Sequence, residues 1–470
     1  MYATRLTSTS GSTPTEDIRT VVRAARQQFE GGQTLGMTWR LRQLEGITRL
    51  LDERAEAAVQ AVSDDTGRPP GEALDQELSA ARRVAEHARR SLAAWMRGER
   101  RSAPLLLQPS FARVHREPNG VVLVVTPWCE PLRLPLTALV GAVAGGNAVI
   151  LKPSELAPAT SAFLAHQLPS YLDPEAVAVV EGGAAEAEAL LAEPIDHLFF
   201  SGQRETARSV MRAAAEQLVP VTLAVGGKNP CFVDRSADLA VAARRIVWGK
   251  YLACGQTCLA PDYVLVHEAV EEALVARIAE AMLERFGEDP KSSSDYGRLA
   301  SVHHITRLER LLRGRGRVVI GGVIDRPDRY FAPTLIQGPA DDEALMRDEI
   351  LGPVLPVRAV SGVDEAIRFI RKRPEPPALY LFAHDGGVEA ELLSSTRSGS
   401  AVVNHVGLHV GAPDLPLGGV GAAGRALQGR DGFESFTQSR TLLRKPSRFD
   451  PDLLATPSTG ARRRLIQSLR

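Results

Sequence analysis

The chain has 470 residues, of which 44% are hydrophobic and 24% charged, a composition typical of a soluble globular protein rather than collagen, a coiled coil or a disordered chain. Basic and acidic residues number 56 each, and the formal net charge of zero removes the electrostatic case for a nucleic-acid or membrane-surface partner. At roughly 150 residues per domain, this length predicts two or three domains.

The first part of the chain is expected to be a short tail followed by helices. Residues 1–20 are rich in serine and threonine and aperiodic, which predicts a flexible tail. Apolar residues at helical spacing then predict helices over 21–29, 39–62 and 78–95.

From Val121 onward, apolar runs typical of buried strands alternate with helical segments. The strands are expected at 121–125, 148–151, 176–180, 197–200 and 220–225, and the helices at 131–141, 161–172, 186–191 and 204–218. This alternation predicts an α/β fold with a parallel, doubly wound sheet, which binds ligands at the carboxyl ends of its strands.

A second unit is expected from residue 226 to 395. It has predicted helices at 242–252 and 270–286 and short strands near 318–320 and 378–382. Residues 444–470 contain a short basic run, which is more typical of a solvated terminus than of a binding segment.

The sequence also predicts the compartment. No apolar run reaches the roughly 18 residues of a membrane-spanning helix, and residues 1–20 lack the apolar core of a signal peptide. The four cysteines are too few for a disulfide framework in a chain of this length. We therefore expect a soluble, cytoplasmic protein with free thiols.

Cys258, in the sequence Gly-Gln-Thr-Cys, is the most suggestive candidate for chemistry. A cysteine near backbone amides or a helix start can obtain the depressed pKa that a nucleophile needs. Taken alone, a cysteine after a glycine is more typical of a small buried hydrophobe. The surrounding motifs change that interpretation.

Five motifs occur in a fixed order along the chain. They are residues 134–155 (LPLTALVGAVAGGNAVILKPSE), 226–230 (GGKNP), 255–258 (GQTC), 348–353 (DEILGP) and 415–421 (LPLGGVG). In these motifs the chain resembles the NAD(P)-dependent aldehyde dehydrogenase superfamily, particularly its class 3 branch, from about residue 21 to residue 443.

The resemblance implies a fold and a domain order. A Rossmann-like cofactor domain would comprise residues 21–97 and 119–225, with a return at 396–434, and an α/β catalytic domain would comprise 226–395. A small β-hairpin extension from 98–118 and 435–443 would join two subunits into a homodimer.

The resemblance also implies a reaction with NAD or NADP on a small aldehyde or an acyl thioester. Cys258 matches the family's nucleophile, which forms a thiohemiacetal and then, after hydride transfer, a thioester that water hydrolyses. Lys152 matches the lysine that holds the adenine ribose, and Glu349 matches the glutamate that hydrogen-bonds the nicotinamide ribose. The same matching gives further cofactor-site candidates, which are Trp128, Glu155, Gly202, Gln203, Gly226 and Leu351. No metal is expected, because the cysteine spacing lacks histidine partners.

Two departures from the family pattern fall on the chemistry. Cys129 stands where the family has the asparagine whose amide completes the oxyanion hole, and losing one such donor typically costs on the order of 100- to 1000-fold in rate. Ala224 stands where the family has the glutamate that activates the deacylating water, a function typically worth roughly 100- to 10,000-fold.

The cofactor loop departs as well. Gln203 and Ala207 replace a serine and a glycine of the phosphate loop, Glu205 adds a negative charge, and Leu351 replaces a phenylalanine near the nicotinamide.

The resemblance places Cys129 near Cys258, which suggests a redox bridge as a hypothesis.

Three side chains are candidates for a displaced base, namely Glu130, His405 and His409, although a solvated turn residue is the blander interpretation of Glu130. Cys254 would lie one turn before Cys258 if that segment were helical.

Three functions remain open on these residues. The first is an aldehyde dehydrogenase-like oxidoreductase with impaired hydrolytic deacylation, which would pass its acyl group to another acceptor or reduce an acyl thioester. The second is a non-redox cysteine-dependent enzyme, such as an acyltransferase, on the same fold. The third is a catalytically inactive binding partner.

Overall fold

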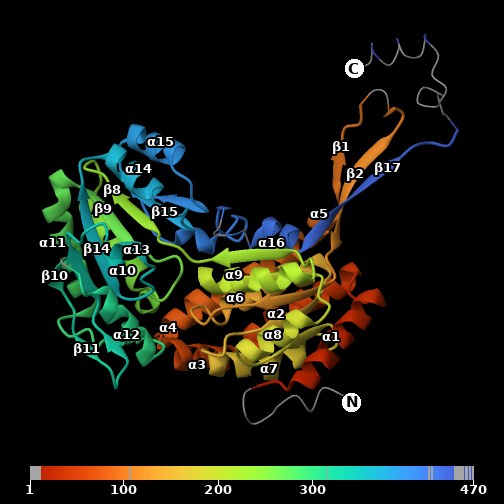
Figure 1. The fold of residues 1–470 in the computed structure, drawn as a ribbon, viewed down its shortest axis with the longest axis horizontal. Helices are drawn as coiled ribbons and strands as arrows, with labels where there is room; N and C mark the ends of the chain where they lie inside the picture. The colour runs from red at the N-terminus through yellow and green to blue at the C-terminus, as the bar shows by residue number, and fades with distance from the viewer. Residues whose placement is uncertain are drawn as a thin grey trace.

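The computed structural model describes residues 12–104, 107–314, 316–421, 424, 427–448, 460, 464 and 467. The helices at the start of the chain are α1 (Thr15–Glu30), α2 (Met37–Glu53), α3 (Ala55–Thr66), α4 (Pro70–Glu72), the π-helix η1 (Ala73–Ser79) and α5 (Ala80–Met96). Of these helices, α1 packs on strands of the first sheet, and α2, α3 and α5 pack on the sheet's own helices α6 (Arg133–Gly145) and α7 (Pro158–Tyr171) (Figure 1).

The tail predicted over residues 1–20 is too long. Helix α1 already begins at Thr15, after Pro14, and its Ile18 is buried against the first sheet's core. Glu16 and Asp17 in the first turn face the positive end of the helix dipole, which favours this start. Residues 1–11 lie outside the described residues.

A five-stranded parallel sheet forms the first unit, in the order β5-β4-β3-β6-β7. Helices cover both of its faces, and α6 is buried along its whole length. The strands are β3 (Val121–Val125), β4 (Ala148–Lys152), β5 (Val177–Val179), β6 (His197–Gly202) and β7 (Val221–Val225). The helices are α6 (Arg133–Gly145), α7 (Pro158–Tyr171), α8 (Ala184–Ala192) and α9 (Arg204–Glu216). The predicted doubly wound α/β sheet is therefore confirmed.

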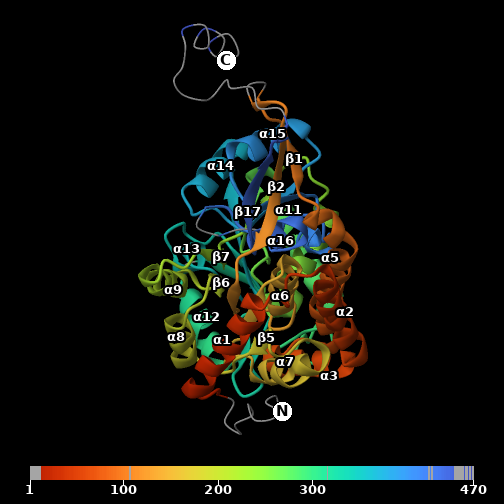
Figure 2. The same ribbon diagram turned by 90° about the vertical axis from the view of Figure 1, so that its right-hand side faces the viewer.

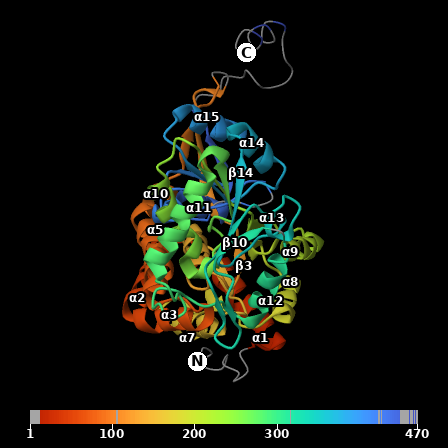
Figure 3. The same cartoon turned by 90° about the vertical axis from the view of Figure 1, so that its left-hand side faces the viewer.

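A seven-stranded sheet forms the second unit, in the order β10-β13-β14-β9-β8-β15-β16, and only β10 is antiparallel to its neighbour (Figure 3). Its strands are β8 (Pro230–Val233), β9 (Tyr263–His267), β10 (Arg317–Ile320), β13 (Thr334–Gln337), β14 (Val354–Val360), β15 (Ala378–Phe382) and β16 (Ser400–Val403). Its helices are α10 (Leu239–Tyr251), α11 (Glu271–Phe286), α12 (Val302–Leu311), α13 (Ala344–Arg347), α14 (Val363–Arg371) and α15 (Gly386–Ser395).

The chain returns to the first unit near its end. Strand β16 still belongs to the seven-stranded sheet, so that sheet extends beyond the predicted boundary at residue 395. After it, the backbone of Gly424 pairs with that of Ala224, and α16 (Gly429–Ser435) packs on α6. The other domain boundaries stay predictions.

A three-stranded antiparallel sheet projects from the body of the molecule (Figures 1 and 2). We call it the arm, and it consists of β1 (Glu99–Arg101), β2 (Phe111–Pro118) and β17 (Thr437–Arg444) in the order β1-β2-β17. Most side chains of β17 are exposed. Among the described residues, no helix has both the length and the apolar character that crossing a membrane requires.

The segment before Cys258 is not an extension of helix α10. It forms the short helix η3 (Leu252–Gly255), in which Ala253, Cys254 and Gly255 have φ values of 52°, 57° and 73°. Gly255 cannot carry a side chain, because a Cβ there would lie 2.2 Å from the carbonyl oxygen of Gly352. Cys254 is buried in the core, with its sulfur 3.9 Å from the carbonyl oxygen of Gly297, so the expectation of one helical turn between Cys254 and Cys258 is wrong.

The left-handed conformation of Ala253 generates a stability prediction. An L-residue with a Cβ pays about 1 kcal/mol in this region, whereas glycine does not. We expect Ala253→Gly to raise the free energy of unfolding in urea by about 0.5–1 kcal/mol. The matched control is Ala57→Gly in the exposed part of helix α3, which should lower it by about 1 kcal/mol. A loss of stability in both variants would contradict the claim of backbone strain.

Candidate active site

An open cavity with a volume of about 110 Å³ lies where the first sheet meets the second unit. Loops after β3, β6 and β7 line one side, so the cavity lies at the carboxyl ends of parallel strands, as expected for this fold class. Nine of the predicted site residues line it, namely Trp128, Cys129, Glu130, Gly202, Gln203, Gly226, Cys258, Glu349 and Leu351.

Lys152 and Glu155 are not among the described residues that line this cavity. Lys152 ends strand β4, and its buried ammonium donates to the carbonyl oxygens of Pro153 and Gly182 and pairs with Glu155 at 3.3 Å. The carboxylate of Glu155 is half exposed, so this pair is a surface feature beside the sheet's carboxyl edge. The predicted ribose role of the pair remains a prediction.

Cys258 follows the η3 turn and is partly exposed to the cavity. The side-chain amide of Asn229 donates to its carbonyl oxygen at 2.8 Å and fixes the backbone at this point. Burial, followed by the negative charge of Glu130, raises the pKa of Cys258 well above its usual value. The resting sulfur is therefore protonated, and its proton has to leave before or during any nucleophilic attack.

The two altered positions of the family pattern border the same cavity. Cys129 and Cys258 are both free thiols, and burial raises the pKa of Cys129, so its side chain stays neutral. The carbonyl oxygen of Cys129 accepts a hydrogen bond of 2.6 Å from the guanidinium of Arg68. Ala224 contributes only a methyl group to the wall and cannot take a proton.

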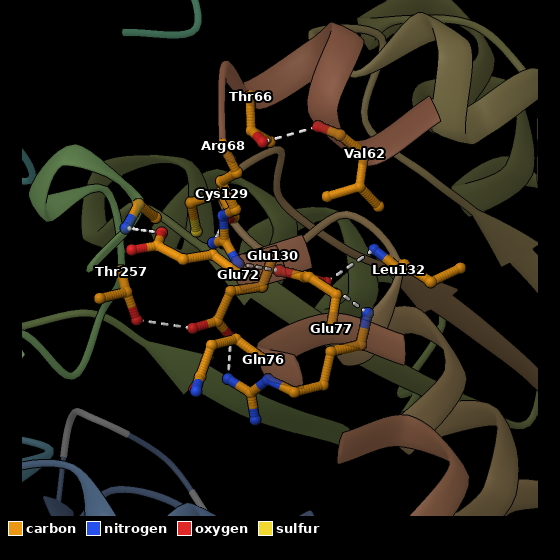
Figure 4. A network of polar contacts seen from close by, with 12 residues as sticks. Val62, Thr66, Arg68, Glu72, Gln76, Glu77, Cys129, Glu130, Leu132 and Thr257 are labelled. Atoms are coloured by element: carbon orange, nitrogen blue, oxygen red, sulfur yellow. Dashed lines mark hydrogen bonds and ion pairs between the residues drawn. The ribbon is translucent and has the colours of Figure 1, made fainter. Parts of the chain in front are cut away.

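Glu130 is not a solvated turn residue. It is 3% exposed, and its two carboxylate oxygens have different partners (Figure 4). Oε2 is paired with the guanidinium of Arg133, while Oε1 accepts a hydrogen bond of 2.7 Å from the hydroxyl of Thr257 and lies 4.0 Å from the sulfur of Cys258.

A second buried ion pair supports the first. Arg68 and Glu77 are 2.7 Å apart, and their side chains are 3% and 0% exposed. The other oxygen of Glu77 accepts hydrogen bonds from the backbone N–H groups of Leu132 and Arg133 at the start of helix α6. The helix start that presents Arg133 is thereby fixed to helix η1.

A second, smaller cavity of about 50 Å³ lies on the other side of this network. Its lining includes Arg68, Glu72, Trp248, Thr257 and Val410. Glu130, Arg133 and Leu259 line both cavities, so the ion pair forms part of the wall between them.

The opposite end of the first cavity contains a carboxylate in close contact with the backbone. A Cβ on Gly226 would lie 2.6 Å from Oε1 of Glu349, so only glycine leaves room for that side chain. Burial, followed by the charge of Asp262, raises the pKa of Glu349 to about 7. Gln203 and Leu351, which replace family residues, border the same space, and Leu351 has a φ of 43°.

The two candidate histidines are not among the described residues lining either cavity. Nε2 of His409 lies 3.0 Å from the hydroxyl of Ser400, and burial lowers the pKa of His409 to about 4. The ring of His405 packs edge-on against Trp248. Among the displaced-base candidates, only Glu130 is therefore placed beside Cys258.

Sequence reasoning missed Arg133, Thr257 and Arg68 as parts of this site. The spacing of Glu130 and Arg133, three residues apart at a helix start, was a usable signal for an ion pair. Thr257 immediately precedes the candidate nucleophile in the sequence, but nothing local indicates that its hydroxyl turns toward Glu130.

Comparison with known proteins agrees with this geometry. Residues 4–442 match the aldehyde dehydrogenase family. Aldehyde dehydrogenase family 3 member B1 of Rattus norvegicus is 40% identical over 423 residues, which cover 90% of each chain. The dimeric NADP-preferring aldehyde dehydrogenase of Rattus norvegicus is 38% identical over 429 residues, covering 91% of this chain and 94% of that one.

A solved structure matches as well. The substrate-bound state of Staphylococcus aureus AldH superimposes with a TM-score of 0.92 at 33% sequence identity, covering 96% of this chain and 99% of that chain. The ordered motifs, the two sheets and these matches agree over almost the whole length. The chain therefore belongs to the aldehyde dehydrogenase family of oxidoreductases.

Proposed function

We propose that this chain oxidises a small aldehyde with NAD or NADP through a thioester on Cys258, and that it releases the acid slowly by hydrolysis. The observation that carries the proposal is a single cavity that holds Cys258 and Glu349 intact but presents Ala224 where the family has its water-activating glutamate. Aldehydes and both cofactors are consistent with the family and with the relative named as NADP-preferring.

The residues present fit a dinucleotide. Gly226 leaves the carboxylate of Glu349 free to accept hydrogen bonds from ribose hydroxyls, since a larger residue would collide with it. Trp128, Gln203 and Leu351 provide the surrounding walls, and Lys152 offers a buried ammonium at the neighbouring strand end. When bound, NAD or NADP supplies the hydride acceptor for the oxidation.

The reaction at Cys258 divides into two parts. In the first, the sulfur attacks the aldehyde carbon and loses its proton, and the resulting thiohemiacetal is oxidised to a thioester. In the second, water attacks the thioester, and the methyl group of Ala224 cannot accept the proton of that water. The neutral thiol of Cys129 is a weak donor to the oxyanion in both parts.

Slow hydrolysis leaves the thioester available to other acceptors. A thiol or amine that enters the cavity beside Cys258 could take the acyl group, and the reverse reaction, reduction of an acyl thioester, needs no activated water. A non-redox acyltransferase would keep Cys258 but not bind the dinucleotide. Titration of the protein with NAD and NADP separates these cases, because absence of binding at millimolar cofactor would eliminate the oxidoreductase.

Restoring the two family residues should restore turnover. We expect Ala224→Glu to raise the steady-state rate of aldehyde oxidation by about 100-fold, because general-base help is worth at least this much, and Cys129→Asn to raise it further. The measurement is cofactor reduction under steady-state conditions. Ala224→Gln has the same size without a base and is the matched control. Equal rates for the Glu and Gln variants would contradict the proposed missing base.

Cofactor binding should depend on pH through Glu349. Its pKa of about 7 is set by burial and Asp262 against the opposing charges of Arg307, Lys228 and Arg204. Because the ionised fraction of such a carboxylate falls about tenfold between pH 8 and pH 6, the Kd for the cofactor should rise about tenfold over this range. Fluorescence titration with the cofactor measures this Kd. Glu349→Gln should bind the cofactor more weakly, with a Kd that does not change between pH 8 and pH 6 through this group. An unchanged pH dependence in that variant would assign the effect to another group.

We also propose that the arm joins two cytoplasmic subunits into a homodimer. The register pairs Arg444 with Phe111 and Leu442 with Arg113, so Phe111 and Leu442 lie on one face of the arm. Both are exposed in the single chain, at 68% and 38%. An unpartnered antiparallel sheet with apolar side chains outward is typical of a surface that another chain covers.

Charges on that face should dissociate the dimer. We expect the double variant Phe111→Asp, Leu442→Asp to sediment as a monomer at micromolar concentration, because two buried carboxylates would face the partner. Leu218→Asp, at an 88% exposed leucine away from the arm, is the control and should not change the sedimentation coefficient. A dimeric double variant would remove the arm from the interface.

A further inference from the structure

The carboxylate that faces the candidate nucleophile comes from a position that the family does not use as its base. Oε1 of Glu130 lies 4.0 Å from the sulfur of Cys258, at the long limit for a thiol donor. Hydrogen bonds between catalytic groups are often long in unliganded sites and shorten when substrate binds. The distance therefore places Glu130 within reach of the proton on this sulfur.

Two neighbours keep Glu130 in the form that can accept a proton. Burial alone would raise the pKa of Glu130, but the charge of Arg133 and the hydrogen bond from Thr257 outweigh burial and hold the pKa below its usual value. Arg133 occupies Oε2, while Thr257 approaches Oε1 from one side and leaves a lone pair of that oxygen for the thiol.

The sulfur is in the opposite state. Its pKa is raised by burial and by Glu130 itself, so the proton stays on Cys258 in the resting protein. The two groups thus form a thiol donor facing a carboxylate acceptor. Since both line the first cavity, an aldehyde bound there meets the sulfur and the carboxylate together.

We propose that Glu130 is the base that accepts the proton of Cys258 when the sulfur attacks the aldehyde. The S–H bond breaks and the S–C bond forms, the π electron pair of the carbonyl moves to its oxygen, and the proton goes to Oε1 of Glu130. The charge of Arg133, no longer matched by a carboxylate, then balances the negative thiohemiacetal oxygen. Glu130 thus acts in the attack step, before the hydrolysis in which the family's glutamate activates water, and this role rests on the proposed function.

A purely structural ion pair makes the opposite prediction for the sulfur. If Glu130 only packed against Arg133, removing its charge would lower the pKa of Cys258, produce more thiolate and leave the attack unchanged or faster. If Glu130 takes the proton, removing it slows the attack although more thiolate is present. In Glu130→Gln, a structural role therefore predicts more thiolate and an unchanged or faster attack, whereas the proton-acceptor role predicts more thiolate and a slower attack.

The experiment compares Glu130→Gln with the unaltered protein in the first turnover. We expect the pre-steady-state burst of cofactor reduction to slow by at least about 100-fold, the usual worth of a positioned base. In the same variant, the pH midpoint for alkylation of Cys258 by iodoacetamide should shift to lower pH. A burst as fast as in the unaltered protein would overturn the proposal.

Two further variants separate proton transfer from folding defects. Glu130→Gln, Arg133→Met removes both charges, so it leaves no unpaired buried cation, and it should lose the burst equally. Glu130→Asp keeps a carboxylate at this position and should give a faster burst than Glu130→Gln. Equal bursts in these two folded, cofactor-binding variants would overturn the proton-acceptor role.

The results that would contradict the oxidoreductase function differ from those that would contradict the role of Glu130. If the unaltered protein neither binds the cofactor nor gives a burst, the oxidoreductase itself is wrong. If the unaltered protein gives a burst and Glu130→Gln gives the same burst, only the role of Glu130 is wrong.

Discussion

The ion pair between Glu130 and Arg133 determines the chemical character of the site around Cys258. Both side chains are almost fully buried, at 4% and 7% exposed, and they form part of the wall between two cavities. Removing one partner of such a pair typically costs about 3–5 kcal/mol, because the other is left as an unpaired buried charge. Each residue of the pair is therefore tolerated in the interior only with the other present. Arg133 helps to keep Glu130 ionised, and Glu130 helps to keep Cys258 protonated.

The surrounding network explains why the pair can exist there. Glu77 holds the start of helix α6 through backbone N–H groups, and Arg68 neutralises Glu77 while also binding the carbonyl oxygen of Cys129. These contacts join helix η1, the loop after β3 and helix α6 into one rigid support. The buried carboxylate of Glu130 is therefore accompanied by a matching cation, Arg133, and by a backbone held in place at the start of α6.

The cofactor side of the cavity keeps a different buried network. Lys228 donates to Asp262 at 2.5 Å and to the carbonyl oxygens of Leu345 and Asp348. Asp262 in turn accepts from the backbone N–H of Ile350. This network positions the loop that carries Glu349 and Leu351, so the Glu349 end of the site keeps its support although Leu351 itself departs from the family pattern.

The sequence allowed the fold and the cavity residues to be predicted because they depend on local patterns and ordered motifs. The apolar run of β3 and the motif that ends β4 at Lys152 indicate these strands from the local sequence alone, without knowledge of what packs against them. The turn at Ala253 and Cys254 could not be predicted, since the apolar pattern of α10 continues into it and the close approach of Gly255 to Gly352 is a tertiary contact. The orientation of Glu130 toward Cys258 depends on Thr257 and Arg133 together, which is a tertiary arrangement.

Slow hydrolysis of a thioester on Cys258 can be tested by intact-mass spectrometry of the protein, quenched in acid during steady-state turnover with an aldehyde and NAD or NADP. We expect most of the protein to carry the mass of one acyl group, located on the peptide containing Cys258. A protein that turns over with no acyl adduct during the steady state would contradict slow deacylation, and an adduct on another cysteine would contradict the choice of nucleophile.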